Sequence, residues 1–205
     1  MCFSATASFS ASAAIGFVGI ATLAKTKNKK AWMLMAVPLL FAIQQFAEGL
    51  IWLSLKNHWP YTLPLTDIYL FFALLLWPIY IPLAARMLET NKVRQLIISI
   101  FCLGGAVVGI ILYAAFLQKP EAAQIINQCL FYPNLAPYPT LFGYLYILFT
   151  VGVGAISSKT IIKLFSVLLL IFSLIAWYFY AINFTSVWCF FAAIISGVLY
   201  FYPKK

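Results

Sequence analysis

Seven long runs of apolar residues limit what this chain can fold into more than any other feature of its sequence. Each run is long enough, or nearly so, for the ~20 residues that cross a ~30 Å hydrocarbon layer. Backbone groups find no water there, so such runs must be helical. We predict a single all-α domain, residues 1–205, with seven transmembrane helices. The expected spans are 4–24, 31–54, 66–86, 95–117, 140–157, 161–182 and 184–202.

The composition excludes several classes of protein. Hydrophobic residues make up 65% of the chain and charged residues only 8%, whereas a soluble domain carries about 25% charged residues. A soluble enzyme domain and a disordered chain are therefore excluded. The net charge of +9 does not indicate a nucleic-acid partner, because the basic residues are segregated along the chain. The partner that the composition predicts is the lipid bilayer.

The positions of the basic residues predict an orientation. If the seven spans alternate in direction, eleven lysines and arginines fall on one side, including Lys25, Arg94 and Lys159, and only Lys56 and Lys119 fall on the other. Cytoplasmic loops carry the excess of basic residues. The N-terminus is therefore expected outside and the C-terminus in the cytoplasm. The first span is expected to be retained, because basic residues follow it and none precedes it.

The longest connection, residues 118–139, lies on the outer side of this predicted topology. Its segment 121–132 contains apolar residues near helical spacing, which favours a short interfacial helix that covers the outer face. A plain loop whose apolar residues dip into the headgroups is the alternative. Many aromatic residues, among them Tyr69, Tyr132 and Trp177, fall near the outer ends of spans and are interpreted as an interfacial belt.

Within the spans, two patterns concern helix shape and packing. Pro78 and Pro82 each remove a backbone donor from the third span and predict a kink. Gly105 and Gly109 are four residues apart in the fourth span, a spacing of small residues that allows two helices to approach closely.

Glu48 is the most informative residue, because an ionisable side chain inside a span is a functional candidate by default. Gln44, Glu48 and Trp52 are spaced four residues apart, and Gln45 lies three before Glu48. These side chains share one helix face, which must face protein or water. We predict an outward-open polar cavity with Glu48 on its wall, the two glutamines at its floor, and Trp52 and Trp188 at its entrance. The alternative is a protonated Glu48 that only ties helices together.

The cysteines and the single histidine suggest a second kind of site. Cys2, Cys129 and Cys189 fall in the outer half of the predicted topology, and His58 lies in an outer loop. Cys2 and Cys129 could form a disulfide in an oxidising compartment. The same residues could bind a soft transition metal, although no CxxC or HxxxH spacing supports a metal cofactor. Cys102 lies in the middle of a span and is expected to be a packing residue.

Three segments resemble a family of uncharacterised bacterial integral membrane proteins. They are residues 1–9 (MCFSATASF), 38–52 and 187–193. The resemblance implies a bacterial inner membrane and brings no activity. The positions that recur in the family match Cys2, Gln44, Gln45, Glu48 and Cys189.

Two functional hypotheses follow, and whether the protein is an enzyme stays open. The first is a small transporter, channel or solute-binding protein whose ligand, a cation or small polar molecule, is bound by Glu48, Gln44 and Gln45. The second is a membrane-embedded metal or redox enzyme that uses the outer cysteines, Glu48 and His58. A sensor or assembly factor ranks last because little cytoplasmic surface is available. The sequence leaves the oligomeric state open.

Overall fold

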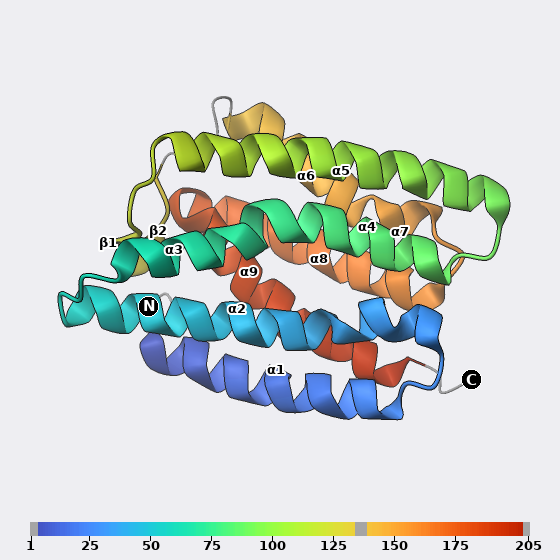
Figure 1. The fold of residues 1–205 in the computed structure, drawn as a ribbon, viewed down its shortest axis with the longest axis horizontal. Helices are drawn as coiled ribbons and strands as arrows, with labels where there is room; N and C mark the ends of the chain where they lie inside the picture. Colours follow the sequence, from blue (N-terminus) through green and yellow to red (C-terminus); the bar gives the residue numbers. More distant parts are fainter. Residues whose placement is uncertain (1–3, 134–138, 203–205) are drawn as a thin grey trace.

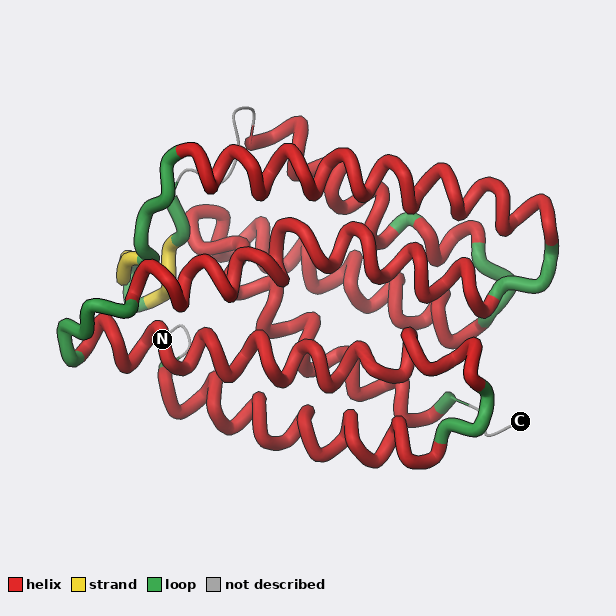
Figure 2. The backbone as a smooth tube through the Cα atoms, viewed as in Figure 1, coloured by secondary structure: helices red, strands yellow, loops and turns green. Residues whose placement is uncertain are grey.

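The fold is a bundle of helices that run up and down beside one another, with one small β-hairpin at one end (Figures 1 and 2). The structure is a computed structural model, and it describes residues 4–133 and 139–202. The prediction of an all-α chain with long apolar helices is confirmed.

The elements follow one another in a simple order. In the first half are α1 (Ala5–Lys25), η1 (Lys29–Ala31), α2 (Trp32–Lys56), α3 (Thr62–Leu70), the π-helical η2 (Phe71–Leu76), α4 (Trp77–Leu88) and α5 (Lys92–Gln118). In the second half are β1 (Gln124–Ile126), β2 (Cys129–Phe131), α6 (Pro139–Val151), α7 (Val153–Ile156), α8 (Thr160–Tyr180), η3 (Ala181–Asn183), α9 (Phe184–Ser196) and η4 (Gly197–Phe201).

Five helical stretches among the described residues are long and apolar enough to cross a membrane, by length and composition. They are Ala5–Lys25, Lys29–Lys56, Thr62–Leu88, Lys92–Gln118 and Thr160–Phe201. The expected count of seven is not supported by this criterion. Thr140–Ile156 is shorter than the others, and the two spans expected over 161–202 form one stretch of 42 residues. That stretch folds back at η3, since the Trp188 indole on α9 donates a hydrogen bond to the Leu169 carbonyl on α8.

The outer surface of the bundle is apolar, which a water-soluble protein would avoid. On α5 the exposed side chains Ile100, Leu103, Val107 and Ile110 form one continuous stripe, because residues three and four apart share a helix face. Phe17 on α1 is likewise 76% exposed. A large exposed apolar surface of this kind is that of a protein whose solvent is lipid.

The two ends of the bundle differ in charge. The connections 26–31, 89–91 and 157–159 lie at one end, which we call the basic end (right in Figure 1). The connections 57–61, 119–133 and 181–183 lie at the other, which we call the hairpin end. Of the described basic residues, only Lys56 and Lys119 belong to the hairpin end. The basic end holds Lys25, Lys27, Lys29, Lys30, Arg86, Lys92, Arg94, Lys159 and Lys163.

The third and fourth apolar runs pack closely at Gly105 and Gly109, as the spacing of these glycines predicts. A Cβ on Gly105 would clash with the Pro78 carbonyl oxygen, and one on Gly109 would lie 3.1 Å from the Leu74 oxygen. The expected close approach of helices is therefore confirmed. Just before Pro78 the helix widens into the π-helical η2, a local irregularity in the region where the prolines predict one.

The predicted helix within 121–132 is wrong, because this segment forms the β-hairpin. Ile125 pairs with Leu130 across the two strands. Asn127 and Gln128 connect them with φ of 53° and 58°, the left-handed conformation that a two-residue hairpin turn requires. Leu130 is fully buried. The helical spacing in the sequence involved too few residues to distinguish the two structures.

Glu89 holds two connections together at the basic end, although only 2% of it is exposed. Its carboxylate accepts hydrogen bonds from the backbone and hydroxyl of Ser158 and from the backbone N–H groups of Thr90 and Asn91. Burial alone would raise the pKa of Glu89, but these four hydrogen bonds favour the charged form and lower its pKa to about 2.

This network predicts an acid-sensitive stability. The folded-state pKa of Glu89, about 2, is below its ordinary value of 4.5, so the stabilisation is complete above pH 4.5 and is lost as the pH falls toward 2. It amounts to at most about 3 kcal/mol. In thermal unfolding of purified protein across this range, Glu89→Gln should be less stable at neutral pH and less sensitive to acid. Ser158→Ala keeps the Glu89 carboxylate but removes one of its hydrogen bonds. Its stability at neutral pH should therefore lie between those of the wild type and Glu89→Gln. Equal acid sensitivity of wild type and Glu89→Gln would contradict this assignment.

Candidate functional site

Glu48 lies at the centre of a buried polar cluster and not on an open cavity. Glu48, Gln44 and Gln45 on α2 are each 0% exposed. The predicted outward-open cavity is therefore wrong for this structure. The reason is tertiary: α1, α3 and α9 pack on this face of α2, and the hairpin covers the same end of the bundle.

Two serine hydroxyls bind the carboxylate. Ser186 on α9 donates to Glu48 Oε1 at 2.6 Å, and Ser8 on α1 donates to Oε2 at 3.5 Å. The side chains of Gln45 and Tyr69 also lie beside the carboxylate. No lysine or arginine among the described residues pairs with Glu48. The carboxyl group thus has hydrogen-bond donors but no counter-charge in the described part of the chain.

The two glutamines leave polar atoms poorly satisfied. Gln44 Oε1 accepts a hydrogen bond from Trp77 Nε1 at 2.7 Å. Gln44 Nε2 and both amide atoms of Gln45 are buried without a well-formed hydrogen bond, although Gln45 lies against the Glu48 carboxylate and Gln44 against the Cys189 thiol. An unpartnered buried polar group costs about 1–3 kcal/mol. Gln45 Oε1 and the Glu48 carboxylate are oxygen ligands that can bind a proton, a hydrated proton or a hard cation, whereas the two unpartnered Nε2 groups are donors that need an acceptor.

The hairpin closes the cluster on the side of the hairpin end. Tyr132, which follows β2, stacks on Tyr69 with ring centroids 4.7 Å apart and an interplanar angle of 7°. Asn183 Nδ2 donates to the carbonyls of Ile126 and Leu130, at 3.3 and 3.1 Å. The backbone N–H of Ala123 donates to Thr66 Oγ1 at 3.0 Å. The hairpin is therefore held by hydrogen bonds and an aromatic stack, and its residue Cys129 is in addition disulfide-bonded.

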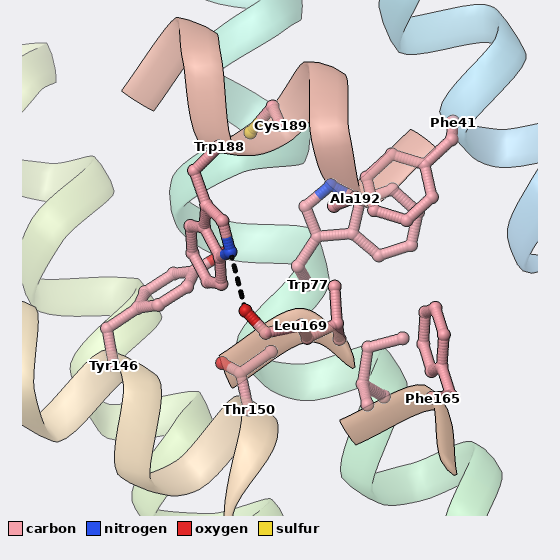
Figure 3. Close-up of a pocket in the computed structure, with 10 residues that line it drawn as sticks. Phe41, Trp77, Tyr146, Thr150, Phe165, Leu169, Trp188, Cys189 and Ala192 are labelled. Atoms are coloured by element: carbon pink, nitrogen blue, oxygen red, sulfur yellow. Dashed lines mark hydrogen bonds between the residues drawn. The ribbon is translucent and has the colours of Figure 1, made fainter. Parts of the chain in front are cut away.

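On the other side of the cluster, toward the basic end, lies a small cavity of about 20 Å³. Its lining is mainly aromatic, as Figure 3 shows. The sequence placed Trp188 at the entrance of a cavity, but the structure places it here, 7% exposed. Trp52 is partly buried and its Nε1 has no partner.

The structure does not assemble the predicted metal site. No group of three or more His, Cys, Asp or Glu side chains comes together in residues 4–133 and 139–202. His58 is exposed in the loop after α2, and Cys129 is disulfide-bonded. Cys189 is a free, buried thiol beside Tyr69 and Glu48. Cys2 lies outside the described residues, so its pairing with Cys129 stays a prediction.

Sequence reasoning missed four members of the cluster. Ser8 and Ser186 are small hydroxyl residues of a kind common in apolar helices, so nothing marked them. Tyr69 and Tyr132 were interpreted as belt residues, but they are 0% and 4% exposed, whereas Trp177 at 61% agrees with a belt. The local sequence could have flagged Tyr69, because its hydroxyl requires a partner inside an apolar run.

The fold and the site together define a helical membrane protein with a buried carboxyl cluster beneath a β-hairpin. Comparison of sequences then places the chain in a family. It belongs to the DUF6629 family, a family of unknown function, which it matches over residues 1–205. Neither a curated protein nor a solved structure matches the chain.

If the hairpin covers the cluster, loosening it should expose Cys189. Asn183→Ala removes two hydrogen bonds of about 1 kcal/mol each, so opening of the hairpin should become roughly 10- to 30-fold more frequent. In a Cys102→Ser background without reductant, Cys189 should react with a small maleimide faster by that factor. Asn57→Ala is the matched control, because Asn57 Nδ2 bonds only Leu53 O within α2 at the same end. Equal rates in both variants would show that the hairpin is not the cover.

Proposed function

We propose that this protein is a small membrane transporter whose substrate-binding carboxylate is Glu48, held in an occluded state. A single observation carries the proposal: Glu48 is completely buried, without a counter-charge in the described part of the chain, beside two glutamines with unpartnered amide atoms. A charge at such depth is costly unless it is neutralised. Neutralisation by a proton or a cation is the simplest solution, and it makes Glu48 a binding site.

Occlusion favours a carrier over an open channel. A channel requires a continuous polar path, whereas Glu48 is covered by Tyr69, Tyr132 and the hairpin on one side. A carrier alternates between states in which its site is open to one side, and many carriers pass through a state closed to both.

We propose seven membrane passes, with the N-terminus outside and the C-terminus in the cytoplasm of a bacterium. Two features of the helices support the number of seven passes. The stretch Thr160–Phe201 folds back at η3, so it supplies two passes. The shorter stretch Thr140–Ile156 reaches about 26 Å at 1.5 Å per residue, near the lower limit for a span. The concentration of bases at the basic end supports a cytoplasmic location for that end.

Reporter cysteines test this orientation. Lys119→Cys at the hairpin end and Lys29→Cys at the basic end both introduce a thiol at an exposed position. In intact cells, a membrane-impermeant maleimide should label Lys119→Cys, and it should label Lys29→Cys only after lysis. The parent protein without a reporter measures background labelling. The reverse pattern would place the basic end outside.

The function itself is tested with Glu48→Gln. Gln is nearly isosteric with Glu but has no charge, so the variant should fold and lose at least tenfold of its transport. We would measure uptake of protons, Na⁺, K⁺ and tetramethylammonium into vesicles that contain the purified protein. Asp67→Asn is the control, because Asp67 near the hairpin end is bonded by the Tyr113 hydroxyl and lies outside the cluster. Wild-type flux in Glu48→Gln, or no flux of any of these ions in the wild type, would overturn the proposal.

A further inference from the structure

We infer that the substrate is a small alkylated ammonium ion, with its charge at Glu48 and its alkyl groups in the neighbouring aromatic cavity. The inference rests on the proposed function, since it gives the chemical class of what Glu48 binds. It follows from three observations: the aromatic residues in the lining of the cavity, the residues that join the cavity to the carboxylate, and the single unpartnered hydroxyl that the lining offers to a bare metal ion.

Five aromatic side chains from five helices line the cavity (Figure 3). Phe41 stacks on Trp77 with centroids 3.9 Å apart. Tyr146 meets Trp188 edge to face at 5.5 Å, and Phe165 completes the set. Aromatic rings attract quaternary ammonium ions through their negative faces. Phe41 and Trp77 cover each other's faces here, so these rings must move apart to surround such an ion. An uncharged apolar pocket would be built as well from leucine and isoleucine.

The cavity adjoins the carboxyl cluster through two side chains. Cys189 lines the cavity and also lies beside Glu48. Trp77 lines it too, and its indole N–H binds Gln44, which is one helical turn from Glu48. A ligand with a charged centre and short alkyl groups could therefore contact both regions at once. The cavity and the carboxyl cluster are therefore neighbours that share Cys189 and the Trp77–Gln44 contact.

The scarcity of polar groups in the lining favours an organic cation over a metal ion or a chain of water molecules. Na⁺ and K⁺ need several oxygen ligands, but the only hydroxyl in the lining that lacks a partner is Thr150 Oγ1. Water likewise needs two or more polar partners to occupy a cavity. The present volume, about 20 Å³, is smaller than an alkylammonium ion, so binding must include rearrangement of the aromatic side chains.

The experiment is a titration of the purified protein with tetramethylammonium chloride, followed by tryptophan fluorescence, because Trp77 and Trp188 line the cavity. Phe165→Leu removes one cage ring while leaving Glu48 untouched, and it should weaken binding about 5- to 30-fold. Phe41→Leu, on another helix, should produce a similar loss. Phe172→Leu is the control, because Phe172 is on α8 like Phe165 but packs on Phe191 outside the lining. Circular dichroism confirms that each variant is folded.

The outcomes separate this inference from the proposed function. Binding that is lost in Glu48→Gln and weakened in both cage variants supports both. Protons or metal ions carried through Glu48, with no tetramethylammonium binding, overturn the inference and leave the proposed function intact. An affinity for tetramethylammonium that is unchanged in Phe165→Leu and Phe41→Leu also overturns the inference, since the aromatic rings then have no part in recognition. Absence of both binding and flux overturns both.

Discussion

The structure depends on one constraint, which is that the interior of this bundle must satisfy every polar group without water. The apolar face of each helix can face lipid, as the stripe on α5 does. Apolar burial therefore does not determine which helices pack together, and small residues and polar side chains determine it instead. Gly105 lets α5 approach the backbone of α4, and Glu48 draws Ser8 of α1 and Ser186 of α9 toward α2. The same constraint makes the unpartnered amides of Gln44 and Gln45 informative, because they are exceptions to it.

The two ends of the bundle are held together by different contacts. At the basic end, the Glu89 carboxylate gathers four hydrogen bonds and fixes the 89–91 and 157–159 connections. At the hairpin end, the cover over Glu48 is attached by hydrogen bonds of Asn183 and Ala123 and by one tyrosine stack, and Cys129 of the hairpin is disulfide-bonded. Both ends therefore fix connections between segments that are distant in the sequence.

Much of the candidate site could be predicted from the sequence, because it depends on local spacing. A carboxylate and two amides on one helix face, inside an apolar run, can be recognised without coordinates, and α2 buries all three. The partners could not be predicted. Ser186 lies 138 residues from Glu48, and hydroxyl residues in apolar helices carry no signal of which carboxylate they will meet. The position of Trp188 in its span predicts its depth in the membrane but not the helix that its ring faces. The sequence therefore predicts it at the cavity entrance, whereas it lies inside the bundle.

The sequence by itself determined that the chain is helical and apolar on its surface, where the basic residues concentrate, and which residues form the polar face of α2. Hydropathy and helical period are local properties, and each run of residues carries them alone. Only the tertiary structure decided that this face is closed and that residues 124–131 form a hairpin above it. Closure depends on which helices pack on α2 and on contacts between distant segments, such as Tyr132 on Tyr69, and no single segment specifies them.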